Sequence, residues 1–146
     1  MFLGQFQHTL DDKGRLMIPA RYRDLLAAGA YITPGFDKCL MMMTDSYFNE
    51  MYNIIGSMNM ADPATRALRR WILSNAYPVE VDKIGRVLVP LNLRQFIGVE
   101  SGDLIVAGQG DYFEVWAPGD WQAQMEDVLQ NNEQRFATLN LSRNTA

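Results

Sequence analysis

One motif occurs twice in this chain, 71 positions apart, and this repetition constrains the fold more than any other feature of the sequence. The segment Gly14-Arg15-Leu16-Met17-Ile18-Pro19 recurs as Gly85-Arg86-Val87-Leu88-Val89-Pro90. Asp11 and Arg23 have counterparts at the same offset, Asp82 and Arg94. Because Asp, Gly, Arg and Pro keep one spacing with apolar residues between them, we interpret the chain as a tandem duplication of one small unit.

Each copy of the unit is expected to contain two strands, a short helix and two more strands. The Asp- and Gly-rich link before Arg15 predicts a hairpin turn, in which Gly14 and Gly85 can adopt positive φ. Pro19 and Pro90 lack an amide hydrogen, so each ends a strand and suits the first turn of a helix. The predicted elements of the first copy are strands 6–10 and 16–18, helix 21–28, and strands 30–33 and 39–43. Those of the second copy include helix 92–97 and strands 103–107 and 112–116.

Longer helices are predicted after each copy and between the two copies. Apolar residues at helical spacing predict helices over 45–57 and 118–130, and Asp45 and Ser46 are expected to cap the first of them. Pro63 stands near the start of a further predicted helix, 63–75. The expected organisation is a first half over 1–60, a linking helix over 61–76, a second half over 77–130, and a polar, loose C-terminal tail over 131–146.

The two halves are expected to share one core. A single half would bury too little apolar surface to be stable alone, whereas hydrophobic residues make up 48% of the whole chain. The predicted fold class is therefore α+β, with a pseudo-two-fold relation between the halves. Such a relation would place both Asp-to-Arg turns on one face.

Charge is distributed unevenly along the chain. The formal net charge is -4, which argues against nucleic-acid binding if the whole chain is considered. Residues 11–23 nevertheless contain four basic and two acidic side chains, and residues 82–94 contain three basic and one acidic. Arginine presents a rigid donor fork that suits phosphate or the guanine edge, and a two-stranded ribbon fits the major groove. The paired turns are therefore candidate DNA contacts.

A purely structural role for the same arginines is the alternative. Arg15 and Arg86 could pair with Asp11 and Asp82 and thereby lock the turns, and a structural role is considered especially for the later arginines of the motif. The two roles are compatible, because an aspartate can hold an arginine fork in position for a ligand.

The sequence gives little support for catalysis or metal binding. His8 is the single histidine and Cys39 the single cysteine, so no zinc pattern exists, and there is no phosphate-binding or dinucleotide-binding motif. Cys39 is expected to be buried. We therefore expect no enzyme activity, no cofactor and no small-molecule substrate.

Other features indicate packing and location. Met41-Met42-Met43 and the tryptophans Trp71, Trp116 and Trp121 are expected to serve core or subunit-interface packing, with Met42 pointing away from its two neighbours. The N-terminus does not resemble a signal peptide, no apolar run reaches membrane-spanning length, and one cysteine allows no intrachain disulfide. These features favour a cytoplasmic protein.

The chain resembles the MraZ family of bacterial transcriptional regulators. The resemblance rests on Met1-Phe2-Leu3-Gly4, on both motif copies from Leu10 to Pro19 and from Val81 to Pro90, and on Arg69-Arg70-Trp71 followed by Ser74-Asn75-Ala76. It covers roughly residues 1 to 135. The second copy departs from the family pattern at Ile84, where many members carry a polar residue.

The resemblance implies two SpoVT/AbrB-like halves that form an intertwined swapped-hairpin barrel with flanking helices. It also implies a ring-shaped homo-oligomer on the nucleoid, which regulates the division and cell-wall gene cluster by binding short direct repeats of double-stranded promoter DNA. The DNA-contacting residues that it implies are Lys13, Gly14, Arg15, Lys83, Gly85 and Arg86. Residues that could support them are Asp11, Asp82, Arg21, Arg23 and Arg94. The alternative is an antitoxin-like or structural interaction module of the same fold, which the polar tail motivates.

Overall fold

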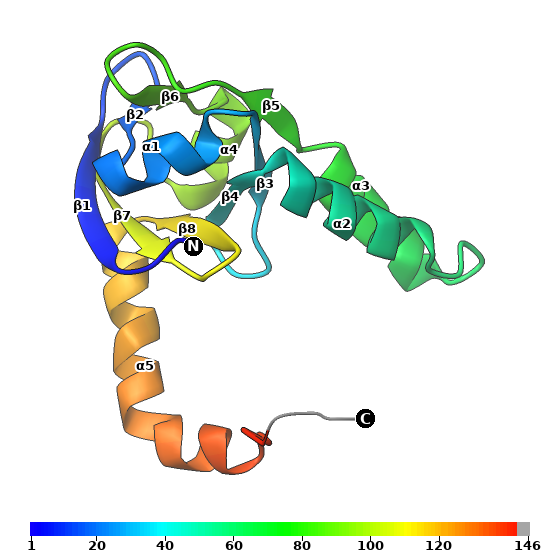
Figure 1. Cartoon of the computed structure of the whole chain (residues 1–146). Coiled ribbons are helices and arrows are strands. Elements are labelled where there is room, and N and C mark those ends of the chain that lie inside the picture. The colour runs from blue at the N-terminus through cyan, green and yellow to red at the C-terminus, as the bar shows by residue number, and fades with distance from the viewer. Residues whose placement is uncertain (143–146) are drawn as a thin grey trace.

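The computed structural model describes residues 1–142, which form an eight-stranded sheet and five helices (Figure 1). The strands of the first half are β1 (Gln5–Leu10), β2 (Arg15–Met17), β3 (Ala30–Pro34) and β4 (Leu40–Thr44). Those of the second half are β5 (Tyr77–Val79), β6 (Arg86–Leu88), β7 (Gly102–Gly108) and β8 (Tyr112–Trp116). The helices are α1 (Ala20–Leu26), α2 (Asp45–Gly56), α3 (Pro63–Leu73), α4 (Leu91–Ile97) and α5 (Pro118–Ala137). The predicted α+β fold class is confirmed.

The strands of the two halves are interleaved in one antiparallel sheet. Their order is β5-β3-β4-β8-β7-β1-β2-β6, and the sheet curls into a nearly closed barrel (Figure 1). The first strand of each half pairs with the third strand of the other half, β1 with β7 and β5 with β3. The second strands, β2 and β6, pair with each other. This exchange of strands confirms the intertwined arrangement of two similar halves.

The pseudo-two-fold axis between the two halves passes through the pairing of β2 with β6. Leu16 lies opposite Val87, its own counterpart in the repeat, while Arg15 faces Leu88 and Met17 faces Arg86. The local axis therefore passes between Leu16 and Val87. A ribbon in which equivalent residues face each other brings the turns that precede its two strands into the same neighbourhood.

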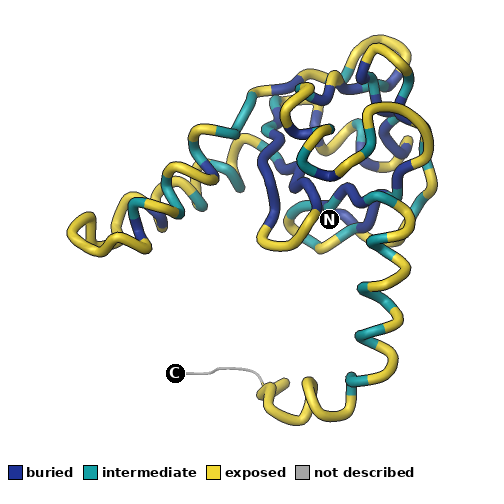
Figure 2. Tube along the Cα trace, turned by 180° about the vertical axis from the view of Figure 1, so that it is seen from behind, coloured by how far each residue is buried: buried dark blue, intermediate teal, exposed yellow. Residues whose placement is uncertain are grey.

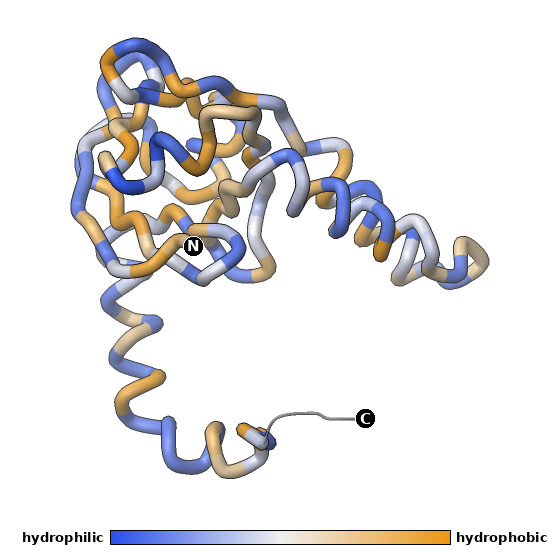
Figure 3. Tube along the Cα trace, viewed as in Figure 1, coloured by the Kyte–Doolittle hydropathy of each residue, from blue (hydrophilic) through white to orange (hydrophobic). Residues whose placement is uncertain are grey.

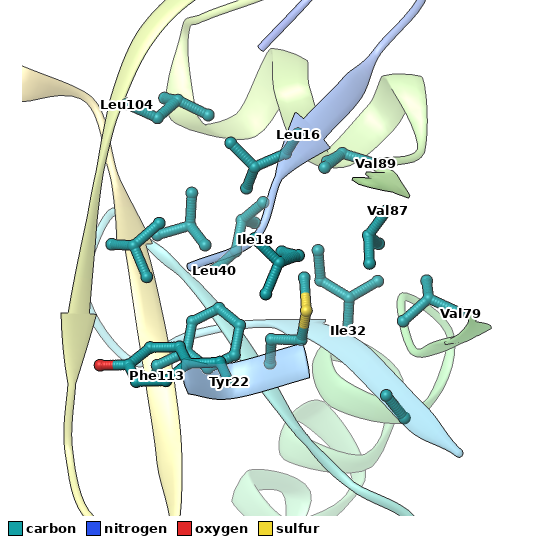
Figure 4. Packing of buried hydrophobic residues seen from close by; sticks show 14 of the residues in the cluster. Leu16, Ile18, Tyr22, Ile32, Leu40, Val79, Val87, Val89, Leu104 and Phe113 are labelled. Atoms are coloured by element: carbon teal, nitrogen blue, oxygen red, sulfur yellow. The ribbon is translucent and has the colours of Figure 1, made fainter. Parts of the chain in front are cut away.

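The core is built from equivalent residues of both halves. Leu16, Ile18, Val87 and Val89 are all fully buried, and they point into the barrel together with Tyr22 and Phe113 (Figure 4). Burying each aliphatic side chain contributes about 1.5–3 kcal/mol relative to its exposure to water. Because these four residues flank the motif arginines, the same packing that holds the core also fixes the backbone of the turns.

The side chains of Met41, Met42 and Met43 point alternately to the two faces of β4. Met42 belongs to the central core, whereas Met41 and Met43 are buried outside that cluster. All three tryptophans pack on other aromatic rings: Trp71 meets Phe96 edge-on, and Trp116 meets Trp121 in the same manner. These contacts confirm the packing roles expected for the run and for these aromatic residues.

Two helical arms extend away from the barrel. One is formed by α2 and α3, which run side by side, and the other by α5 (Figure 1). Much of their surface is exposed (Figure 2), and apolar residues alternate with polar ones along them (Figure 3). Among the described residues, none in α5 is buried.

Several predicted boundaries were wrong. Helix α5 continues past the expected end at Gln130 to Ala137, so the first part of the expected tail is helical. Polar contacts accompany this extension, because the Asp127 carboxylate accepts a hydrogen bond from the side-chain amide of Asn131 at 2.9 Å and pairs with Arg135 along the helix. The last four residues of that tail, 143–146, lie outside the described part of the chain.

The cap of α2 also differs from the prediction. Thr44, rather than Asp45 or Ser46, occupies the N-cap position, and its hydroxyl accepts a hydrogen bond from the Tyr47 amide. Thr44 is the last residue of β4, so the strand passes directly into the helix. Across residues 1–142, no helix is both long and apolar enough to cross a membrane.

Candidate nucleic-acid interface

The first Asp-to-Arg turn is organised by one carboxylate. Asp11 Oδ1 accepts hydrogen bonds from the backbone amides of Lys13 and Arg15 at 3.0 and 2.9 Å. Asp11 Oδ2 accepts a third from Nε of the Arg15 side chain at 3.0 Å. The turn is closed by the amide of Gly14, which donates to the carbonyl of Asp11 at 3.0 Å. Asp11 therefore fixes both the backbone of the turn and the direction of its arginine.

The second turn repeats this arrangement almost atom for atom. Asp82 Oδ1 accepts from the amides of Ile84 and Arg86 at 3.0 and 2.9 Å, and Asp82 Oδ2 accepts from Arg86 Nε at 3.0 Å. The amide of Gly85 donates to the carbonyl of Asp82 at 3.0 Å. The structural role considered for Arg15 and Arg86 is thus present in both copies. Within residues 1–142 the outer nitrogens of these two guanidinium groups donate no hydrogen bond.

Hydrogen bonds lower the pKa of both turn aspartates. For Asp11 and Asp82, the largest cause is the backbone amide of the following arginine, and the arginine side chain lowers the pKa further. Both carboxyl groups are thus held below their ordinary pKa of 3.8. They are ionised at neutral pH, which keeps the arginine forks in place.

The two turns are tied to each other. The amide of Ile18 donates to the carbonyl of Gly85 at 2.9 Å, and the amide of Val89 donates to the carbonyl of Gly14 at 2.8 Å. An additional ion pair crosses between the turns, since Arg86 Nη1 lies 3.8 Å from Asp11 Oδ2. The turns consequently lie side by side at one end of the barrel (Figure 1).

The later arginines of the motif support the turn of the opposite half. Arg23 Nε donates to the carbonyl of Ile18 at 3.0 Å, and its guanidinium lies against Gly85. Arg94 Nε donates to the carbonyl of Val89 at 3.0 Å, and its guanidinium lies against Gly14. Gly14 and Gly85 have φ of 84° and 98°, a conformation that favours glycine. Sequence reasoning missed this crossing, because it depends on the exchange of strands between halves.

The structure therefore brings most of the predicted site residues together. Lys13 and Lys83 are exposed on the turns, and the side chains of Arg15 and Arg86 are 34% and 24% exposed. Arg21 is separate from this group: it is exposed on α1 and makes no hydrogen bond or ion pair within residues 1–142.

The outer face of the β2–β6 ribbon joins the two turns. Side chains alternate along a strand, so Leu16 and Val87 point into the core while Arg15, Met17, Arg86 and Leu88 share the outer face. Leu88 is 59% exposed and lies opposite Arg15. We call this surface, together with residues 12–14 and 83–85, the ribbon face. Leu88 was not among the predicted site residues, although its alternation with buried Val87 could have shown that it belongs there.

Groups that could support other chemistry are arranged unfavourably for it. Burial, and then the neighbouring Glu114 carboxylate, raise the pKa of the Cys39 thiol well above its ordinary value, so the thiol stays protonated at neutral pH. Partial burial and the charge of Arg23 lower the pKa of His8. No group of three or more His, Cys, Asp or Glu side chains within the described residues could hold a metal ion.

Comparison with known proteins identifies the family. The profile of the family described as "MraZ protein, putative antitoxin-like" matches residues 1–71 and again residues 72–143. The chain belongs to the MraZ family. Each match contains one Asp-to-Arg turn, so each copy of the duplication matches the MraZ model separately.

Individual relatives match over nearly their whole length. The chain is 49% identical to Transcriptional regulator MraZ of Roseiflexus sp. (strain RS-1), over 94% of this chain and 94% of that protein. It is 46% identical to Transcriptional regulator MraZ of Roseiflexus castenholzii, with the same coverage of both chains. With Transcriptional regulator MraZ of Thermomicrobium roseum it shares 40% identity over 95% of this chain and 99% of that protein.

Proposed function

We propose that this MraZ protein is a transcriptional regulator that binds double-stranded DNA through its ribbon face. The observation that carries the proposal is the pair of Asp-braced arginines, Arg15 and Arg86, held side by side at one end of the barrel. Each aspartate accepts from Nε, and within residues 1–142 the outer guanidinium nitrogens of Arg15 and Arg86 donate no hydrogen bond, although Arg86 Nη1 forms a longer ion pair with Asp11. Bidentate binding to guanine O6 and N7 uses such nitrogens as donors. The relatives named as transcriptional regulators support this reading.

The ribbon face also has the size and shape that DNA recognition needs. A two-stranded antiparallel ribbon is one of the elements that enter a major groove. Lys13 and Lys83 flank the arginines and would contact phosphates, which position a protein on the duplex without reading its sequence. In this proposal Gly14 and Gly85 serve the turn geometry, and Arg23 and Arg94 hold the turns from behind. The target that family membership favours is a set of short direct repeats in the promoter of the division and cell-wall gene cluster.

The proposed role requires no catalytic step, no metal and no cofactor. It places the protein in the cytoplasm, on the nucleoid. The net charge of -4 limits non-specific attraction to DNA, so a single chain with two turns would bind weakly. Several chains bound along tandem repeats would bind far more tightly, because each later contact is intramolecular.

The test is binding of single-arginine variants to duplex DNA from that promoter, with a scrambled duplex as the reference. Arg15→Ala and Arg86→Ala should each weaken specific binding about tenfold or more, and each should reduce the salt dependence. Lys38→Ala is the matched control, since it removes one positive charge from a surface pair with Asp120 away from the turns. Wild-type affinity in both arginine variants, measured by fluorescence anisotropy, would overturn the proposed interface.

We further propose that copies of the chain assemble head to tail through the helical arms. The α2–α3 arm exposes Tyr52, Ile54, Met58 and Met60, and α5 exposes Leu129 and Phe136. One helix of the first arm complements α5 in charge. α3 contains three arginines and no acidic residue, while its neighbour α2 contains two carboxylates; α5 contains four carboxylates and one arginine. Two different surfaces that fit each other form a heterologous contact, which closes into a ring when the rotation between copies allows it.

Measuring the mass of the oligomer in solution tests this assembly. Ile54→Asp and Leu129→Lys each place a repelling charge in the proposed contact, and each should convert the oligomer to smaller species in light scattering. Ser46→Ala, on an exposed position of α2, should leave the mass unchanged. Retention of the full oligomer in both charged variants would exclude the arms as the interface.

An antitoxin-like role is the second candidate, and the exposed α5 is the observation that favours it. In that case α5 would cover a partner protein rather than another copy. A different chain that co-purifies in a fixed ratio, and is lost when the protein is truncated after Gln130, would favour this role. Assembly of the purified chain alone, abolished by the same truncation, would favour the ring.

A further inference from the structure

The two turns have the same pattern of backbone hydrogen bonds, but the side chains at their tips, Lys13 and Ile84, are different. The amides of Lys13 and Ile84 occupy equivalent places, and each donates to the Oδ1 atom of its turn aspartate at 3.0 Å. The first tip is an exposed cation. The second is an isoleucine with 60% of its surface exposed. The difference therefore lies in the side chains and not in the fold of the turns.

Ile84 is an exposed apolar side chain within a basic surface. Leu88 is 59% exposed and shares the outer face of β6 with Arg86. Lys83 is the direct neighbour of Ile84 in the turn. An exposed apolar side chain close to a braced arginine suits a ligand that offers both an apolar group and a hydrogen-bond acceptor edge.

Ile84 is also held ready for contact. The carboxylate of Asp82 fixes its amide, and its β-branched side chain has few rotamers to lose. A side chain that is already ordered gives up little entropy on binding.

We propose that Ile84 contacts the C5-methyl group of a thymine in the major groove, beside the base pair that Arg86 reads. This inference rests on the proposed DNA-binding function. Thymine is the base whose major-groove edge carries a methyl group, and apolar side chains read it by contact. An adjacent base pair supplies the acceptor atoms for Arg86. Ile84 and Arg86 would thus contact two neighbouring base pairs, one through a methyl group and the other through acceptor atoms.

The unlike tips give the chain a polarity on DNA. Two identical turns related by a two-fold axis would read a palindrome equally in both directions. With Lys13 on one side and Ile84 on the other, reversing the duplex would set the isoleucine against the site of the lysine. A single chain therefore binds its element in one orientation.

The experiment removes the methyl group from the DNA rather than from the protein. Duplexes selected by the wild-type chain from a random-sequence pool are resynthesised with deoxyuridine in place of thymidine, one position at a time. Deoxyuridine keeps the O4 acceptor and lacks only the methyl group. We expect one position per bound element at which the wild-type affinity falls about fourfold, the effect of one buried methyl group.

The Ile84→Ala variant should bind the thymidine and deoxyuridine duplexes equally at that position. Lys13→Ala is the matched variant of the other turn: it should bind all duplexes more weakly and keep the wild-type ratio between thymidine and deoxyuridine. A wild-type chain insensitive to deoxyuridine, or an Ile84→Ala variant that retains the sensitivity, would overturn the inference. Loss of oligomer mass in Ile84→Ala would also overturn it, in favour of a protein contact. If the wild-type chain selects no duplex, the proposed function itself fails, and that result is distinct from methyl-independent selection.

Discussion

The guanidinium of Arg94 lies against Gly14 of the opposite turn, so closely that a Cβ atom on Gly14 would fall 2.7 Å from Arg94 Cζ. Arg23 and Gly85 form the equivalent pair. Each turn is thus supported by an arginine that belongs to the other half of the chain. The same arginine donates to the carbonyl of its own half, at Ile18 or Val89, and so joins the two halves beneath the ribbon face.

Replacement of Gly14 by alanine should destabilise the protein. The positive φ costs about 1–2 kcal/mol for a residue with a Cβ, and displacing Arg94 from Val89 removes a hydrogen bond of about 1 kcal/mol. A loss of about 2–3 kcal/mol in the free energy of unfolding is expected from urea titration. Gly119→Ala is the control, since nothing lies within 4 Å of the added atom, and it should not reduce stability. Equal stability of both variants would contradict the close approach.

Replacement of Arg94 by methionine should lower stability and not merely DNA affinity. Methionine keeps an unbranched stem but cannot donate to the carbonyl of Val89, which is then left without this donor. A loss of about 1–3 kcal/mol is expected from denaturant unfolding. Arg21→Met should stay within about 0.5 kcal/mol of wild type, because Arg21 is exposed on α1. If Arg21→Met lost more unfolding free energy than Arg94→Met, the supporting role of Arg94 would be contradicted.

Acid should weaken the turns through Asp11 and Asp82. Their folded pKa is lowered below 3.8, so their contribution to stability is present above that pH and disappears as the pH falls through the lower folded value. Asp11→Asn should therefore unfold at lower urea than wild type at about pH 7, and the difference should shrink as the pH is lowered below 3.8. Asp12→Asn changes an exposed neighbour and should show no comparable convergence. A constant difference for Asp11→Asn at all pH values would show that its charge does not brace the turn.

The cap of α2 gives a local test of the arm that extends from β4. Thr44→Ala removes the hydroxyl that accepts from the Tyr47 amide and should lower stability by about 1 kcal/mol. Ser46→Ala, two residues further on, should have little effect. Thermal unfolding monitored by circular dichroism compares the two variants. A larger loss of stability in Ser46→Ala than in Thr44→Ala would contradict the cap at Thr44 and favour the predicted cap.

The sequence predicted those parts of the fold that depend on local pattern. The duplicated Gly-Arg-x-x-x-Pro motif located both turns, and the prolines marked the ends of β2 and β6 to within a residue or two. Alternation placed Met42 on the opposite side of its strand from Met41 and Met43, and in the structure its side is the one that faces the central core. Strand propensity could not show that β5 pairs with β3 and not with β6, because that pairing depends on contacts between distant segments.

The candidate site was predictable in its parts but not in its assembly. Asp11 and Arg15, like Asp82 and Arg86, are close in sequence, so their pairing could be anticipated. The contacts of Arg23 with Gly85 and of Arg94 with Gly14 join residues from different halves, and only the exchanged strands bring them together. The end of α5 was missed for a different reason: residues 131–137 lack apolar periodicity, and the helix continues there with polar contacts to Asp127.

The pairing of Leu16 with Val87 means that one repeat is structurally incomplete. A single repeat would leave that strand without its partner and its turn without the opposing arginine. Because both copies lie in one chain, their encounter does not depend on concentration. The two copies also need not be identical, so one turn can differ from the other at its tip while both keep the same fold.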